Sequence, residues 1–192
     1  MNLQSRYPTT PDEFLRWNEG REGKREFVRG RVVEMMINVT RNHADIAANL
    51  ILAIGTRLDR KLFSLGSADF GVQTPDGIRY PDMYVDRRRP ESRGIDLSAS
   101  EPVFLAEILS PSSYGRDFVE KLADYKGVPS LLHYLILSQD EPRVWLWSRT
   151  KEGDWADIAE IAGDESAIDL GGLGITLPLS ELYSGILDRR TN

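Results

Sequence analysis

Apolar side chains recur every four residues between residues 42 and 63, and this spacing predicts a long amphipathic helix. The repeating positions are Ile46, Leu50, Ile54, Leu58 and Leu62. Thr40 or Asn42 can cap the start of the helix, because a side-chain oxygen there accepts a hydrogen bond from an unpaired backbone N–H group. We expect the apolar side of this helix to pack against a sheet.

Short apolar runs bounded by turn residues predict the strands of that sheet. These runs are residues 25–36, 68–74, 78–86, 103–109, 133–138, 143–149 and 154–161. Residues 25–36 should form a hairpin around Arg29-Gly30, because glycine tolerates the positive φ of a tight turn. Residues 103–109, VFLAEIL, are apolar at six of seven positions, which is typical of a strand buried on both faces of a sheet.

Three further helices are expected, and together with the strands they define a fold class. They span residues 11–19, residues 113–126 and a short C-terminal segment with Ser180 as its cap. The succession of elements predicts an α/β fold: a mixed β-sheet core flanked by helices, with an N-terminal β-hairpin and C-terminal antiparallel strands. A chain of 192 residues suits one well-buried core, so we expect residues 1–192 to form a single domain.

Composition removes several classes of site. The chain has no cysteine, which excludes disulfides, thiolate zinc sites and cysteine nucleophiles. Its two histidines, His43 and His133, leave little material for a histidine-based metal site or a serine triad. No apolar run approaches the roughly 20 residues of a membrane span, and the N-terminus lacks a signal-peptide pattern. We therefore expect a cytoplasmic protein without a membrane partner.

The formal net charge of −6 argues against a broad basic surface for nucleic acid. A local one is compatible with the sequence. Four arginines, at positions 87, 88, 89 and 93, give residues 87–96 a net charge of about +2 after two acids are counted. This loop is interpreted as either a solvated loop or a local contact surface.

Glu107 is the single charge in VFLAEIL, and a buried carboxylate costs several kcal/mol without a partner. Asp82 follows Pro81, which cannot donate to a sheet ladder and therefore suggests a strand start or edge. If the two strands are neighbours, Asp82 and Glu107 converge, and a proton or a cation must relieve their repulsion. Carboxylate oxygens without histidine or thiolate suit Mg²⁺, Mn²⁺ or Ca²⁺.

The helix expected at residues 113–126 offers a cation for Glu107. Counted at about 100° per residue from Phe118, Tyr125 and Leu122 lie within the apolar stripe, and Lys121 lies at its edge, near −60°. Lys121 could therefore lean over the sheet toward Glu107. Asp117 and Asp124 lie further round the helix and are expected to face solvent.

Six segments, in this order, resemble the Uma family of restriction-endonuclease-like proteins within the PD-(D/E)XK nuclease superfamily. The segments are REFVRGRVVEM, NHADIAANL, YPDMYVD, FLAEILSPSS, DFVEKLADYKGVPSLLHYLIL and RVWLWSR. The resemblance runs from about residue 25 to residue 183. It implies a restriction-endonuclease-like core, a Mg²⁺-dependent (or Mn²⁺-dependent) endonuclease activity on DNA, and a homodimer.

The resemblance also implies site residues. Asp82 matches the aspartate of the PD element and Glu107 the second acidic metal ligand. The superfamily usually places its lysine two residues after that acid, where this chain has Leu109; in the Uma-type arrangement Lys121 takes that place. Glu26 matches a recurrent glutamate that can join the site as a further acid. His43 matches a recurrent position without an assigned role.

Each of these residues also has an ordinary structural interpretation. Asp82 could be a strand-end acid, and Glu107 a buried salt-bridge partner of Lys121 or an arginine. Lys121 could reach past the stripe to water, and Glu26 could pair across the hairpin with Arg31. His43 could be a helix-start residue. Three tryptophans fit sheet packing better than base stacking: Trp145, Trp147 and Trp155.

Two functional hypotheses follow. The first is a Mg²⁺-dependent DNA endonuclease that uses Asp82, Glu107 and Lys121. The second is a nuclease-like fold that no longer cuts and serves as a nucleic-acid or protein interaction module. The absence of lysine at position 109 and the acidic net charge favour the second.

Overall fold

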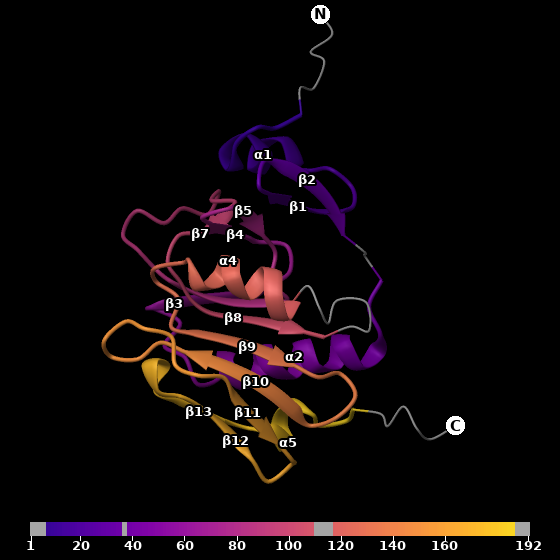
Figure 1. The fold of residues 1–192 in the computed structure, drawn as a ribbon, viewed down its shortest axis with the longest axis vertical. Coiled ribbons are helices and arrows are strands. Elements are labelled where there is room, and N and C mark those ends of the chain that lie inside the picture. Colours follow the sequence, from indigo (N-terminus) through magenta and orange to yellow (C-terminus); the bar gives the residue numbers. More distant parts are fainter. Residues whose placement is uncertain (1–6, 36–37, 110–116, 187–192) are drawn as a thin grey trace, which may run out of the picture.

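A computed structural model describes residues 7–35, 38–109 and 117–186, except for the side chains of residues 117 and 118. Its centre is a six-stranded mixed sheet in the order β11-β10-β9-β8-β6-β3 (Figure 1). These strands are β3 (Phe63–Ser67), β6 (Met83–Arg87), β8 (Pro102–Ile108), β9 (His133–Leu137), β10 (Arg143–Ser148) and β11 (Ala159–Ala162). Only the β8–β9 pair in this sheet is parallel. The expected mixed α/β architecture is confirmed.

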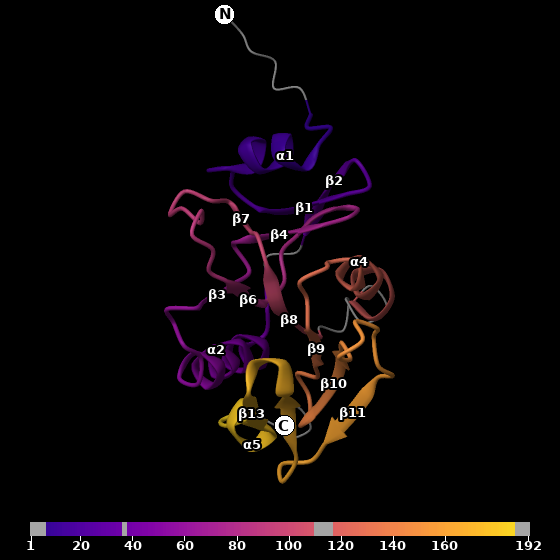
Figure 2. The same cartoon turned by 90° about the vertical axis from the view of Figure 1, so that its left-hand side faces the viewer.

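Strand β8 is covered on both faces, and all seven of its residues are buried. On one face, Ala106 packs in a cluster with Ile46 and Leu50 of α2 (Arg41–Gly55). On the other face, Leu105 packs in a cluster with Tyr125 of α4 (Leu122–Lys126). Figure 2 shows the two helices on opposite sides of the sheet. The prediction of a doubly buried strand at VFLAEIL is therefore confirmed.

The N-terminal part of the chain forms a second sheet above the first (Figure 1). Its order is β2-β1-β5-β4-β7, and α1 (Pro11–Asn18) packs on it. The strands are β1 (Lys24–Val28), β2 (Arg31–Met35), β4 (Gly71–Thr74), β5 (Gly77–Arg79) and β7 (Ser98–Ala99). The β1–β2 hairpin turns at Arg29 and Gly30, whose φ values are +49° and +76°. Both residues are thus left-handed, as a type I′ turn requires, and the predicted hairpin is confirmed.

Two expected elements differ from the structure in ways that matter for the site. The helix predicted to reach residue 63 ends at Gly55, and Leu62 is 57% exposed. The four-residue spacing of apolar residues continues past the end of the helix, but the chain there turns toward strand β3. Phe63–Ser67 forms this strand, which pairs with β6. The strand expected at 78–86 is interrupted at residues 80–82, so β5 lies in one sheet and β6 in the other. Pro81, which lacks an N–H group, occupies this crossing.

The remaining boundaries shift less. Residues 117–121 form a π-helical turn before α4, and residues 113–116 of the predicted helix lie outside the described ranges. Strand 154–161 shortens to β11. The C-terminal strands are β12 (Ala167–Leu170) and β13 (Ile175–Pro178), and a short 3-10 helix, η2 (Gly171–Leu173), joins them. The final helix is α5 (Leu179–Leu182), with Pro178 rather than Ser180 at its cap position. None of the helices in the described ranges has the length and apolar character that crossing a membrane requires.

His133 makes the stability of this fold sensitive to acid. It is buried at the start of β9, with its Nδ1 2.9 Å from Ser148 Oγ, and burial lowers its pKa to about 4. Since the unfolded chain takes up a proton near pH 6.5 and the folded chain does not, stability should fall as the pH drops from 6.5 to 4. We expect this residue to account for about 2 kcal/mol of that loss.

Urea unfolding at pH 7 and pH 4 can measure this contribution. His133→Asn should lose less stability over that pH range than the wild type, because it has no titrating ring but keeps a polar atom near Ser148. An identical pH dependence for both proteins would show that His133 does not contribute to acid unfolding.

Candidate functional site

The candidate site lies where the start of β6 meets the end of β8. Met83 pairs with Ala106 in antiparallel register, so Asp82, the residue before Met83, comes opposite Glu107. The backbone N–H of Ile108 donates to Asp82 Oδ2 over 2.8 Å. The structure thus brings Asp82 and Glu107 to the same edge of the sheet, on neighbouring strands.

His43 reaches Asp82 from the first turn of α2. Thr40 caps this helix and accepts a hydrogen bond from the His43 backbone N–H at 3.2 Å. The His43 Nε2 atom then lies 3.2 Å from Asp82 Oδ2. The recurrent histidine without an assigned role is therefore a direct neighbour of the first predicted metal ligand.

Three neighbours keep Asp82 ionised despite its burial. Burial alone would raise the pKa of this carboxyl, but the hydrogen bonds from His43 and Ile108 and the charge of Lys121 lower it below its ordinary value. A carboxylate that is already ionised and fixed through one oxygen is suited to binding a cation.

Glu107 is 3% exposed, and two donors compensate its charge. Lys121 Nζ lies 2.9 Å from Glu107 Oε1, and the Tyr125 hydroxyl donates to the same oxygen over 2.9 Å. Burial, followed by the charge of Glu107, raises the pKa of Tyr125 well above its usual value, so the hydroxyl keeps its proton. Lys121 itself is 4% exposed, which argues against the interpretation that it extends to water.

A buried network holds Glu26 away from the hairpin surface. Arg79 Nη1 lies 2.7 Å from Glu26 Oε2, and the Tyr80 backbone N–H donates to Glu26 Oε1 over 3.2 Å. Across the hairpin, Glu26 lies opposite Val33. The proposed pairing of Glu26 with Arg31 is therefore wrong, because Glu26 turns inward to an arginine of the adjacent strand.

The same arginine also binds the helix that carries Lys121. Arg79 donates through Nε to Asp124 Oδ2 over 2.8 Å, and its Nη2 contacts the same oxygen. Asp124 is 5% exposed, so the expectation that it faces solvent is wrong. The π-helical turn at Asp117–Lys121 explains the error, because a phase counted at 100° per residue does not hold through such a turn.

Arg79 therefore connects the N-terminal sheet to α4. Asp124 comes three residues after Lys121 and directly before Tyr125, so fixing Asp124 also fixes the two donors to Glu107. Glu26 joins the site through Arg79, which pairs with both Glu26 and Asp124. Sequence reasoning missed Arg79 altogether, since its two acidic partners are 53 and 45 residues away in the chain.

The residues at this edge fit a hard divalent cation. Among the described residues, no three His, Cys, Asp or Glu side chains cluster as a complete metal cage. Mg²⁺ does not need one, because it commonly binds through one or two carboxylates and fills its remaining positions with water and substrate phosphates. Asp82 and Glu107 supply that number of carboxylates.

The buried network yields a prediction about stability. Arg79→Met should lower the free energy of unfolding by about 3 kcal/mol, because Glu26 and Asp124 would remain buried without a cation. Adding Glu26→Gln and Asp124→Asn to this variant should restore part of the loss, since both uncompensated charges are then removed. Chemical denaturation of the wild type, Arg79→Met and the triple variant measures the three free energies of unfolding.

A matched arginine tests whether burial is the cause. Arg57 Nη2 lies 2.7 Å from Glu181 Oε1 on the surface, so Arg57→Met should change stability by less than about 1 kcal/mol. Equal losses for Arg57→Met and Arg79→Met would contradict the importance assigned to the buried network.

Comparisons with known proteins agree with this fold. Two uncharacterized proteins of Synechocystis sp. (strain PCC 6803) are similar: one is 27% identical over 92% of each chain. The other is 24% identical over 86% of this chain and 94% of its own. A crystal structure from Anabaena variabilis, described as a putative nuclease of DUF820, superposes with a TM-score of 0.74 at 18% identity. That match covers 94% of this chain and all of the other, and it shows a shared fold.

A family model described as "Putative restriction endonuclease" matches residues 11–180. This range includes the acidic edge of the sheet, the buried arginine and the helix that carries Lys121. The chain therefore belongs to the Uma2 family.

Proposed function

We propose that the protein is a Mg²⁺-dependent endonuclease that hydrolyses phosphodiester bonds of DNA at Asp82, Glu107 and Lys121. One observation carries the proposal: a buried lysine and two acids from adjacent strands meet at one edge of the central sheet. Membership in the Uma2 family supports the reaction class. A homodimer would provide two such sites for the two strands of a duplex.

Asp82 and Glu107 would hold Mg²⁺ or Mn²⁺. When bound, the cation supplies a water of lowered pKa and polarises the phosphate. The hydrogen bonds that Asp82 accepts from His43 and the Ile108 N–H restrict its orientation before substrate arrives. Such preorganisation reduces the reorganisation that the reaction would otherwise require.

Lys121 would contribute a fixed positive charge beside the phosphate. Its ammonium group pairs with Glu107. Its backbone belongs to the helical segment that Arg79 holds through Asp124. The position of the ammonium group is therefore set by protein contacts rather than by solvent. A positioned ammonium can orient the attacking water or stabilise negative charge that develops on the phosphate oxygens.

The interaction module is the second candidate. The observation in its favour is that Glu107 Oε1 already accepts from both Lys121 and Tyr125, as a closed structural ion pair would. The two candidates differ in a measurable way, because only the endonuclease requires divalent cation.

Nicking of supercoiled plasmid in Mg²⁺ or Mn²⁺ tests the proposal. Wild-type protein should nick the plasmid, and Glu107→Gln should be slower by roughly 10²-fold or more, since it loses a charged ligand. Asp86→Asn is the matched control. Asp86, in β6, is a buried acid like Glu107, but it lies outside the site and accepts a hydrogen bond from the Glu101 N–H at 2.7 Å. Equal nicking by wild type and Glu107→Gln would reject the site, and no nicking by wild type would favour the interaction module.

Lys121→Met separates metal binding from catalysis. The variant should still bind Mn²⁺, as measured by electron paramagnetic resonance, because Asp82 and Glu107 remain. Its nicking rate should fall by roughly 10²-fold, as expected for loss of one preorganised charge at a reaction centre. Glu107→Gln should lose both properties. If Lys121→Met nicked as fast as wild type, Lys121 would have only a structural role.

A further inference from the structure

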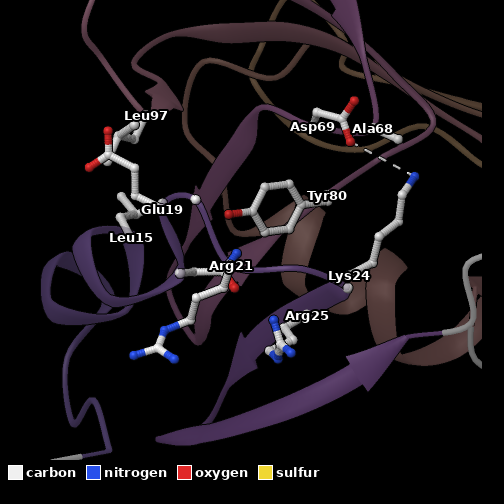
Figure 3. A pocket seen from close by; sticks show the side chains of 12 residues that line it. Leu15, Glu19, Arg21, Lys24, Arg25, Ala68, Asp69, Tyr80 and Leu97 are labelled. Carbon is white, nitrogen blue, oxygen red and sulfur yellow. Dashed lines mark ion pairs between the residues drawn. The ribbon is translucent and has the colours of Figure 1, made fainter. Parts of the chain in front are cut away.

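A cavity lies beside the candidate site, at the junction of the two sheets. It has a volume of about 340 Å³. Its walls come from the end of α1, the start of β1 and the segments around Ala68, Tyr80 and Leu97 (Figure 3). In Figure 3 the Tyr80 ring stands among the side chains of Arg21, Arg25 and the Lys24–Asp69 ion pair.

The chain brings this cavity close to Asp82 by two routes. Tyr80 is two residues before Asp82, so their Cα atoms lie within about 7 Å of each other. Ala68 and Asp69 follow Ser67, which pairs with Met83, the residue after Asp82. Successive phosphates of one strand advance only about 3.4 Å along a duplex, so the cavity and the acids are a few nucleotides apart.

The lining combines basic side chains with one aromatic ring, that of Tyr80, and with polar groups. The Arg21 and Arg25 guanidinium groups lie 4.3 Å and 5.8 Å from the Trp17 ring centroid. The acids that pair with Lys24 and Arg25 lie at the long end of ion-pair distance, at 4.0 Å for Asp69 and 3.8 Å for Glu34. Arg21 has its Nε 2.5 Å from the Trp17 carbonyl oxygen. An anion that binds here would therefore displace only weak ion pairs.

Two lining residues also carry buried polar atoms for which the described residues provide no hydrogen-bond partner. These atoms are Arg25 Nη1, a donor, and Asn18 Oδ1, an acceptor. Burial raises the pKa of Tyr80, so its hydroxyl keeps its proton, and the Asn18 side chain hydrogen-bonds to that hydroxyl. The hydrogen-bond donors could bind a phosphate, and Asn18 Oδ1 could accept from an N–H group of a base. The Tyr80 ring could stack on the base.

We propose that this cavity, the Tyr80 pocket, binds one nucleotide of the DNA strand whose scissile phosphate lies at Asp82 and Glu107. The proposal rests on the proposed endonuclease function and adds where the substrate strand is held. Arg21 and Arg25 contact a phosphate, and the base lies against the Tyr80 ring.

The arginine-rich loop is the alternative surface, and its position is unfavourable. Arg87 is at the opposite end of β6, about 16 Å from Asp82 for five residues of extended chain. Arg89 lies 2.6 Å from Glu91 and 3.6 Å from Glu101. The loop therefore lies far from the site, and one of its arginines is already paired with acids.

Fluorescence anisotropy with a labelled single-stranded oligonucleotide, in EDTA to prevent cleavage, tests the pocket over a series of salt concentrations. The variant Arg21→Gln/Arg25→Gln should bind roughly tenfold more weakly. Its plot of log affinity against log salt should be less steep by about 0.7, the value for one phosphate that is no longer neutralised. The control Arg87→Gln/Arg89→Gln removes the same charge and should leave the slope unchanged.

Tyr80→Leu provides a second test without a change in charge, because it removes the ring against which the base lies. It should bind more weakly than wild type with an unchanged salt slope, and thermal melting followed by circular dichroism should show that it folds. Deoxyadenosine monophosphate and inorganic phosphate serve as competitors. Neither should displace the oligonucleotide, because the pocket holds part of a longer strand.

The outcomes separate this proposal from the function on which it rests. If wild type nicks plasmid but the pocket variants bind like wild type, or only the Arg87/Arg89 control loses affinity, the pocket assignment is wrong and the endonuclease stands. If the mononucleotide competes effectively, the ligand is a free nucleotide rather than a DNA strand. If wild type neither nicks plasmid nor binds DNA, both proposals fail.

Discussion

The compensation of Glu107 is the constraint on which the rest of the structure depends. A carboxylate near the end of a doubly buried strand is tolerated only with strong donors nearby, and Lys121 and Tyr125 both donate to its Oε1. Both donors come from one helical segment, so that segment must lie against this face of the sheet. Placing Glu107 in β8 thus determines where α4 packs.

Arg79 extends this dependence to the second sheet. It links Glu26 of β1 to Asp124 of α4, so the N-terminal hairpin contributes to the position of Lys121 through Arg79. The proposed pocket and the proposed catalytic site are thereby connected, because the strand that begins with Lys24 and Arg25 also contains Glu26. A change in the hairpin can reach the acidic edge through a single guanidinium group.

Local chemistry explains which features could be predicted from sequence. The apolar run around Glu107 and the glycine turn at Arg29-Gly30 each act within a few residues, and their consequences were predictable. The crossing between the two sheets at Pro81 was not, because the apolar pattern of residues 78–86 continues across it. The placement of Lys121 near Glu107 followed from helix phase, although the π-helical turn made the same reasoning fail for Asp124. The partners of Arg79 and the contact between His43 and Asp82 depend on how distant segments align, which periodicity does not encode.

The crossing at residues 80–82 has a consequence for how such chains can vary. Each of the three successive residues has a different structural role. Tyr80 lines the pocket, Pro81 lies between the two sheets, and Asp82 accepts hydrogen bonds from His43 and Ile108. Inserting or deleting one residue here would shift Asp82 out of line with Glu107 and move Tyr80 away from Glu26 at the same time. The length of this crossing is therefore constrained from both sides, by the pocket and by the acids.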